Sequence, residues 1–146
     1  MTAYKSSQET RRTAIPPKML ATNEMGGRQR VAYFEYIVPA GGVAVNDTID
    51  LITLPLGARV LGGSIAFEAM SSGAGTSQLQ IGTAASVNKY LDTTSVDAAG
   101  AALIANTIAC GFGEELSADT LLIAKVLGEV WAAGKKLSGW IEYALD

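Results

Sequence analysis

Residues 31–69 read VAYFEYIVPAGGVAVNDTIDLITLPLGARVLGGSIAFEA, in which runs of β-branched and aromatic residues are separated by Pro, Gly, Asn and Asp. The runs suit a pleated, half-buried sheet, and the separating residues suit reversals of the backbone. The pattern predicts strands at 30–38, 48–54 and 58–70. The first has apolar residues on both faces, which is typical of a strand that is central in a sandwich or covered by another subunit. Gly62-Gly63 inside the third predicts a β-bulge or a close approach of another backbone.

The remainder of the chain predicts further short strands, at 77–82, 101–108, 119–127 and 137–145. Residues 86–91 predict one helical turn that begins at Ser86. Trp131 is expected near the middle of the turn before the last strand. Seven or eight short strands about ten residues apart, with turn signals between them, indicate a single all-β domain over 31–146, an antiparallel β-sandwich or jelly roll.

Residues 1–30 lack this periodicity and predict a separate unit, an extended basic N-terminal arm. The arm carries a net charge of +4, whereas residues 31–146 carry −7. Its two adjacent prolines exclude a helix and favour an extended chain, and Gly26-Gly27 supplies a joint before the first strand. Its apolar residues are not needed in a solvated tail, so we expect it to bind a partner; a free tail or an arm folded along its own body are the alternatives. The predicted partner-binding residues are basic, apolar or proline: Arg11, Arg12, Ile15, Pro16, Pro17, Lys18, Met19, Leu20, Arg28 and Arg30.

The composition excludes several broad classes of protein. A chain of 146 residues fits one domain with a real core, and 49% hydrophobic against 17% charged residues excludes a wholly disordered chain. No run approaches the roughly 18 uncharged apolar residues of a membrane span. The polar start, MTAYKSSQETRR, predicts no signal peptide, so we expect synthesis in a host cytoplasm and no membrane partner.

The absence of histidine removes the usual general base near neutral pH and the commonest zinc ligand. The single cysteine, Cys110, has apolar neighbours and is expected to be a buried small hydrophobe; a reactive thiol is the alternative. The sequence therefore predicts no catalytic residue, no cofactor, no metal and no small-molecule substrate.

Four pairs of residues stand out as possible ligand sites: Gly73 and Gly75, Gly111 and Gly113, Glu114 and Glu115, and Asp92 and Asp97. The glycine pairs lack the third glycine of a dinucleotide loop and the Gly-Lys-Ser/Thr of a phosphate loop, so we interpret them as turns. The carboxylate pairs lack the spacing of a calcium loop, so we interpret them as ordinary loop or strand residues.

Nucleic acid is the rival partner for the basic arm, because Lys and Arg neutralise phosphates. The whole chain has a net charge of −3, and the arm's charges are scattered rather than grouped with aromatic residues. An acidic protein surface is therefore favoured over nucleic acid as the partner of the arm.

Four stretches carry a resemblance to a known family: RVAYFEYIVPAGGVAVNDTIDLITLPLGARVLGG (30–63), LQIGTAASVNKYL (79–91), LSGWIEYALD (137–146) and, in the arm, IPPKMLATNEMGGR (15–28). The sequence resembles small virion proteins of tailed bacteriophages that are encoded near the major capsid protein and are described as structural or head-decoration (cement) proteins. The resemblance implies a β-sandwich that assembles as homotrimers on the outer capsid surface, with terminal arms that lace capsomers together.

The predicted function is therefore that of a non-enzymatic capsid decoration protein, located on the capsid surface of the virion. Its expected partners are the major capsid protein and other copies of itself. A head fibre base or a tail structural protein is the first alternative. A carbohydrate-binding module, with Trp131, Trp140 or Tyr143 as a sugar platform, is the second, although aromatic residues within strands are more often part of a core.

Overall fold

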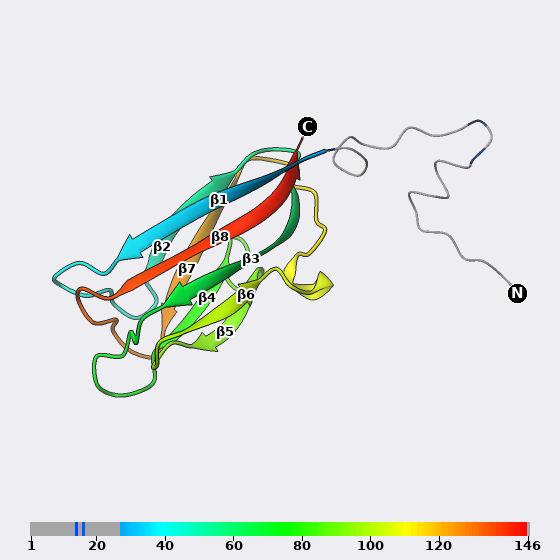
Figure 1. Ribbon diagram of the computed structural model, residues 1–146. Coiled ribbons are helices and arrows are strands. Elements are labelled where there is room, and N and C mark those ends of the chain that lie inside the picture. Colours follow the sequence, from blue (N-terminus) through cyan, green and yellow to red (C-terminus); the bar gives the residue numbers. More distant parts are fainter. Residues whose placement is uncertain (1–13, 15, 17–26, 146) are drawn as a thin grey trace, which may run out of the picture.

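The structure is a computed structural model that describes residues 14, 16 and 27–145 (Figure 1). The elements of the described part are, in chain order, β1 (Arg28–Ile37), β2 (Thr48–Leu54), β3 (Arg59–Phe67), β4 (Gln78–Gly82), β5 (Leu91–Ser95), β6 (Gly100–Ile104), the 3-10 helix η1 (Ile108–Cys110), β7 (Thr120–Leu127) and β8 (Lys136–Leu145). In the described part no helix is long and apolar enough to cross a membrane.

The strands form two antiparallel four-stranded sheets packed face to face, with the orders β1-β8-β3-β6 and β2-β7-β4-β5 (Figure 1). Within them β1 pairs with β8, β2 with β7, β3 with β6 and β4 with β5. These four pairs are those of one long two-stranded ribbon that folds over on itself, which is the topology of a jelly roll. The predicted all-β sandwich of jelly-roll type is confirmed.

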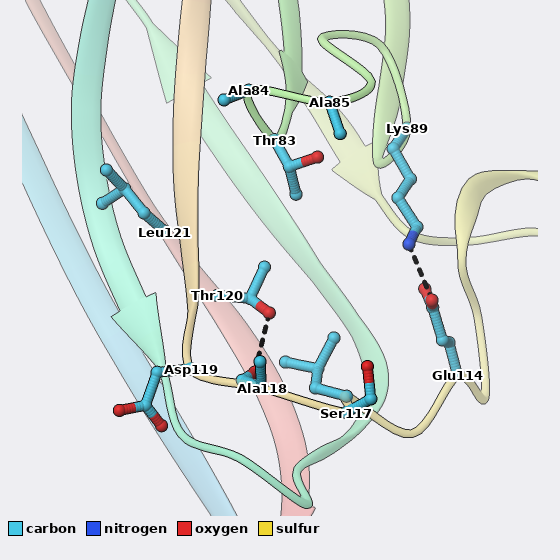
Figure 2. Close-up of a pocket in the computed structure, with 11 residues that line it drawn as sticks. Thr83, Ala84, Ala85, Lys89, Glu114, Ser117, Ala118, Asp119, Thr120 and Leu121 are labelled. Atoms are coloured by element: carbon cyan, nitrogen blue, oxygen red, sulfur yellow. Dashed lines mark hydrogen bonds and ion pairs between the residues drawn. The ribbon is translucent and has the colours of Figure 1, made fainter.

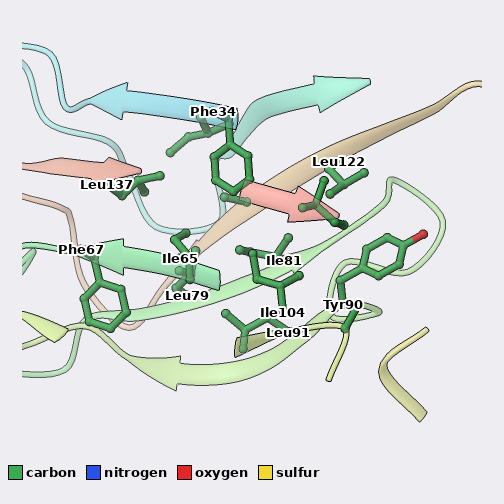
Figure 3. Close-up of a cluster of buried hydrophobic side chains, with 14 of the residues drawn as sticks. Phe34, Ile65, Phe67, Leu79, Ile81, Tyr90, Leu91, Ile104, Leu122 and Leu137 are labelled. Carbon is green, nitrogen blue, oxygen red and sulfur yellow. The ribbon is translucent and has the colours of Figure 1, made fainter. Parts of the chain in front are cut away.

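The core lies between the two sheets and is built from the inward-facing residues of both (Figure 3). Phe34, Ile65 and Ile141 come from the first sheet, and Leu79 and Leu122 from the second. Because side chains alternate between the faces of a strand, their neighbours in sequence point outward. Each sheet therefore has one face that packs in the core and one outer face that can contact solvent or another molecule.

Two glycines in β3 and β8 bring the strands of the first sheet close together. A bulge between Val60 and Gly62 interrupts the pairing of β3 with β8, as the glycine pair in the sequence predicts. A side chain at Gly63 would collide with the backbone carbonyl of Trp140. At Gly139 a Cβ would lie 2.6 Å from the carbonyl oxygen of Ser64 and 2.8 Å from the ring of Phe34, so only glycine fits beneath that ring.

The predicted helical turn at 86–91 is present only as one hydrogen-bonded turn without a helix, in which the backbone N–H of Lys89 donates to the carbonyl oxygen of Ser86 (3.2 Å). Residues 83–90 form a tight loop, in which the backbone N–H of Ser86 donates to the carbonyl oxygen of Thr83 (3.1 Å), and Leu91 begins β5. The predicted strand at 101–108 is confirmed only as far as Ile104, and its last residue instead begins η1. Residues 83–90 join β4 to β5 within one sheet, whereas η1 lies in the connection from β6 to β7, which passes from one sheet to the other. In both places the tertiary connection outweighs local propensity.

Trp131 is fully buried and joins the core from the connection between β7 and β8. Its backbone pairs with that of Val43 and of Ser71, so it closes one end of the sandwich. Tyr143 is partly buried against the same core. Neither residue can serve as an exposed sugar platform, and the interpretation of both as core residues is confirmed.

Candidate interaction surface

The outer face of the β1-β8-β3-β6 sheet carries large apolar side chains in contact with solvent. We call it the apolar face and define it by five residues with these exposed fractions: Val31 62%, Tyr33 58%, Ile37 57%, Leu103 59% and Trp140 40%. An exposed group of this kind, bordered by polar residues, is typical of a protein interaction site.

The strand register places three of these residues in one row across the sheet. Tyr33 lies opposite Trp140, Trp140 lies opposite Ser64 on β3, and Ser64 lies opposite Leu103 on β6. The next row has only small residues on β8, β3 and β6. Near the end of β3 and the start of β8 there is a hollow of about 210 Å³ lined by Ala66, Phe67, Glu68, Lys136 and Ser138. Aromatic residues beside a shallow hollow form the anchors and recesses that interfaces favour.

A polar cluster at Glu35 lies between Tyr33 and Ile37 on the apolar face. Lys136 Nζ lies 3.0 Å from Glu35 Oε2, and the Tyr33 hydroxyl donates to the same carboxylate at 2.9 Å. The hydrogen bond from Lys136 and then that from Tyr33 lower the pKa of Glu35, and the Glu35 carboxylate raises the pKa of Lys136. The carboxylate thus holds the Tyr33 ring in place on the face.

The outer face of the β2-β7-β4-β5 sheet has a different character and serves as the internal reference. It has one exposed large apolar residue, Leu121, and is otherwise formed mainly by polar residues: Thr48, Asp50, Gln78, Gln80, Thr93, Ser95 and Lys125. Gln80 Nε2 donates to Thr93 Oγ1 at 2.7 Å across neighbouring strands. We call this surface the polar face; its composition is that of a sheet surface that remains in water.

The predicted partner-binding residues of the arm are only partly within the described residues. Arg11, Arg12, Ile15, Pro17, Lys18, Met19 and Leu20 lie outside them, and Pro16 is an exposed residue at a bend. Arg28 and Arg30 belong to β1, where they are exposed and lie opposite Leu145 and Tyr143. The sheet therefore begins inside the segment that the sequence assigns to the arm, and these two cations stand at the end of β1 from which the arm leaves.

A second hollow, of about 340 Å³, lies between the β4–β5 loop and residues 114–121 (Figure 2). Lys89 Nζ and Glu114 Oε1 form an ion pair of 2.6 Å at its rim, so the only lysine that lines it is already paired. Glu115 pairs separately with Arg59 at 2.7 Å. The ammonium group of Lys89 is held by a carboxylate, which favours a structural role over catalysis at this hollow.

The other possible ligand residues are engaged in local structure. Asp97 accepts a hydrogen bond from the backbone N–H of Ser77 at 2.7 Å, and Asp92 accepts one from that of Thr93 at 2.8 Å, which lowers the pKa of Asp92. The four paired glycines of the sequence have positive φ angles in loops, which confirms their interpretation as turn residues. Within residues 14, 16 and 27–145 no group of His, Cys, Asp and Glu could hold a metal ion.

The expectation that Cys110 is a buried hydrophobe is wrong. Cys110 is half-buried in η1, and its apolar neighbours Ile108 and Phe112 are both exposed. An apolar sequence context predicts burial only where the backbone enters the core, and η1 instead lies at the end of the sandwich, outside the core (Figure 1).

Sequence reasoning missed the apolar face as a unit. The alternation in the sequence places Val31, Tyr33 and Ile37 together, and separately sets Trp140 apart from the core residues of β8. What it does not contain is the pairing of β1 with β8, across more than a hundred residues, that brings Tyr33 next to Trp140.

Comparison with known proteins gives a fold rather than a family. No protein-family model matches the chain, and no curated protein matches its sequence. The fold is similar to that of chains in solved phage capsids. A chain in the cyanophage Pam1 capsid asymmetric unit is 23% identical, with a TM-score of 0.73 and with 100% of both chains covered.

Two further capsid structures contain similar chains. The match in the capsid of Ralstonia phage GP4 is 18% identical, with a TM-score of 0.68, and covers 82% of this chain and 86% of that one. The match in the acid-stable capsid of Helicobacter pylori bacteriophage KHP30 is also 18% identical, with a TM-score of 0.60, and covers 80% and 87%. At these identities the likeness shows a shared jelly-roll fold.

Proposed function

We propose that the chain is a non-enzymatic decoration (cement) protein that binds the outer surface of a bacteriophage head and stabilises the capsid lattice. The observation that carries the proposal is the match over the full length of both chains to a chain of a phage capsid asymmetric unit. A jelly roll hosts many functions, so the fold alone does not decide between them. The apolar face adds a surface suited to assembly, and the paired state of Lys89 and Glu114 favours a structural role.

The proposed self-association is a homotrimer in which the apolar face of each copy is covered by a neighbour. Exposed aromatic side chains, such as Tyr33 and Trp140, contribute most to binding when a partner buries them. Three copies related by a rotation close into a ring, which leaves no unsatisfied apolar surface at an open end.

The proposed capsid contact is made by the arm, with Arg11, Arg12 and Ile15. The arm is basic, whereas residues 31–146, which we call the body, are acidic. The arm and the body are therefore attracted to partner surfaces of opposite charge. Repetition of one weak contact around a symmetric shell adds avidity, so each arm needs only modest affinity.

The experiment adds purified protein to expanded heads that lack it, and measures occupancy by electron microscopy and the temperature at which the heads release DNA. We expect full-length protein to occupy regular sites on the outer surface and to raise that temperature. A variant without residues 1–27 is expected to fold, because the core residues of the described part lie between Phe34 and Ala144, and to lose binding.

A charge reversal tests the arm in the full-length chain. Arg11→Glu with Arg12→Glu should reduce occupancy by at least about tenfold, since each arginine that contacts an acidic partner contributes on the order of 1 kcal/mol. Lys125→Glu with Lys135→Glu makes the same change of charge on the body and should leave occupancy unchanged. Equal losses in both variants, or none in either, would refute the assignment of the arm as the capsid contact.

Location in the virion separates the proposal from its first alternative. Density for this protein on the tail or at the base of a head fibre would replace decoration by another virion role, and it would leave the self-association of the body intact. Trp140 is the one sugar-platform candidate that is substantially exposed among the three weighed. Binding to a glycan array that is lost in Trp140→Ala would favour the carbohydrate-binding alternative.

A further inference from the structure

The edge of the first sheet formed by β1 is longer and more regularly paired than the other sheet edges. An open edge exposes a row of backbone N–H and C=O groups that can pair with another chain, and proteins shorten, bend or charge such edges to prevent this. β5 and β6 are edge strands of only five residues, and β2 is bent by a bulge between Asp50 and Ile52. β1 has ten residues and an uninterrupted register with β8.

The outward side chains of β1 add to this exposure. Val31, Tyr33 and Ile37 are each more than half exposed, and the strand contains no proline. Within residues 27–145 the only strand that pairs with β1 is β8, on its other side. β1 carries charges at Arg28, Arg30 and Glu35, but its length and regular register favour its being covered by another strand in the working protein.

We propose that residues 17–25 of one copy pair with β1 of a neighbouring copy as an additional antiparallel strand. This inference rests on the self-association proposed above and names the segment and the strand that carry it. The segment reads PKMLATNEM and supplies apolar, polar and charged residues in turn. Donation of a strand to an open sheet edge provides main-chain hydrogen bonds for affinity and alternating side chains for register.

One antiparallel register matches the outward residues of the two strands. Among the pairs that it creates on the outer face are Lys18 with Glu35, Leu20 with Tyr33, and Thr22 with Val31. These are an opposite-charge pair, an aliphatic residue beside an aromatic ring and a pair of β-branched residues, which are the favourable cross-strand combinations. A shift of two residues in either direction would place Lys18 opposite Tyr33 or Ile37, a charge against an apolar side chain.

The same register explains where the added strand would end. Pro16 and Pro17 come opposite Ile37 and Tyr36, at the last two residues of β1. Proline has no N–H to donate to a sheet and is found at strand ends and edges. The two prolines therefore stop the strand at the point where β1 itself stops.

The arm is long enough to reach a neighbouring copy. Twenty-six residues precede Gly27, and a fully extended chain of that length spans up to about 85 Å. β1 is only about 33 Å long at the usual rise of a strand. Residues 1–16 would then remain free for the proposed capsid contact.

The neighbour's arm is favoured over the chain's own arm by the extent of the apolar face. A hairpin through Gly26-Gly27 could place the chain's own arm on β1 in the same register, because two-residue glycine loops connect hairpins. A strand beside β1 leaves Leu103 exposed, however, since β6 lies at the opposite edge of the sheet. A neighbouring copy that covers the face brings its own arm to the β1 edge at the same time, and exchange of an identical element is a low-cost route to a closed assembly.

Cysteine cross-linking tests both the register and the donor of the strand. In a full-length Cys110→Ser background, Leu20→Cys with Tyr33→Cys sets two thiols in one predicted pair, at the separation that a disulfide requires. We expect oxidation to produce covalent oligomers that reduction returns to single chains. A second variant, Lys18→Cys with Glu35→Cys, retains Tyr33 in case its ring is needed for association.

The matched control is Leu20→Cys with Thr93→Cys, which sets the second thiol on the polar face. We expect it to cross-link at least about tenfold more slowly than the two test variants. A disulfide that joins residues of one and the same chain would overturn the exchange between copies. Cross-linking of both test variants no faster than the control would overturn the added strand itself.

The outcome is separable from the capsid proposal because both can be measured on the same sample. Cross-linked oligomers that fail to bind heads would refute the decoration function and support the exchanged strand. Binding to heads without cross-linking would support the decoration function and refute the exchanged strand. Circular dichroism of the reduced variants should match that of the unmodified protein, since positions 33, 35 and 93 are exposed.

Discussion

The two outer faces of the sandwich share one core and differ in almost everything else. The apolar face presents Tyr33, Trp140 and Leu103 in a single row, whereas on the polar face Gln80 donates a hydrogen bond to Thr93. The core therefore constrains only half of each strand. The outward residues of each strand suit the surroundings of the sheet in the working protein. On our proposal, the polar face contacts water and the apolar face contacts a second copy.

The largest expected effect is on folding stability, and it distinguishes a core residue from an apolar-face residue in the same strand. Ile141 is fully buried and its neighbour Trp140 points outward. Ile141→Ala should lower the free energy of unfolding by about 2–5 kcal/mol, since it leaves a cavity that the sheets cannot close. Trp140→Ala should change it by less than about 1 kcal/mol. Urea denaturation of the two variants measures the difference, and similar losses would contradict the outward assignment of Trp140.

The second expected effect is on self-association, and it distinguishes the apolar face from the polar face. Trp140→Lys should weaken self-association by at least about thirtyfold, because a central aromatic anchor contributes about 2 kcal/mol or more. Thr93→Lys adds the same side chain to the polar face and should leave association unchanged. Sedimentation over a range of protein concentrations measures both constants. A larger effect from Thr93→Lys would move the interface to the other sheet.

The third prediction concerns Glu129, in the connection that carries the chain from one sheet to the other. This carboxylate is almost fully buried and accepts hydrogen bonds from Ser77 Oγ at 2.9 Å and from the backbone N–H of Ala74 at 2.8 Å. A hydrogen bond from Ser71, followed by those from Ser77 and Ala74, lowers the pKa of Glu129 to about 2.

A depressed pKa means that the ionised group stabilises the folded state above the ordinary pKa of 4.5, and that this contribution is lost as the pH falls towards 2. Glu129→Gln should therefore lower the melting temperature at pH 6, and the difference from the unmodified protein should shrink as the pH approaches 2. Calorimetry between about pH 2 and 6, an interval that spans both pKa values, checks this. A difference that grows with acidity would show that the carboxylate is not held in its ionised form.

Sequence reasoning located most strands because their alternation is local. The span of β2 agrees with its prediction at both ends, where Asn46-Asp47 and Pro55 mark the turns. β5 escaped prediction because its residues, LDTTS, form a short polar edge with no apolar alternation. Just before β5, Ser86 suggested the N-cap of a helical turn, but the loop between β4 and β5 does not form a helix.

The candidate surface was harder to predict than the fold, for a physical reason. The outward residues of β1 could be seen as a set, and Trp140 could be seen as an outward residue of β8. Their adjacency depends on which strands pair, and that is decided by the closing of the whole ribbon rather than by any local pattern. The roles of Arg11, Arg12 and the rest of the arm stay predictions, since these residues lie outside the described part.

The most direct test of the covered apolar face is the mass of the protein in solution, measured by sedimentation equilibrium at micromolar concentration. The account predicts three times the 15.1 kDa of one chain for the unmodified protein, and a shift towards a single chain for Trp140→Lys. A mass of one chain for the unmodified protein at every concentration, with Tyr33 and Trp140 still open to solvent, would contradict it.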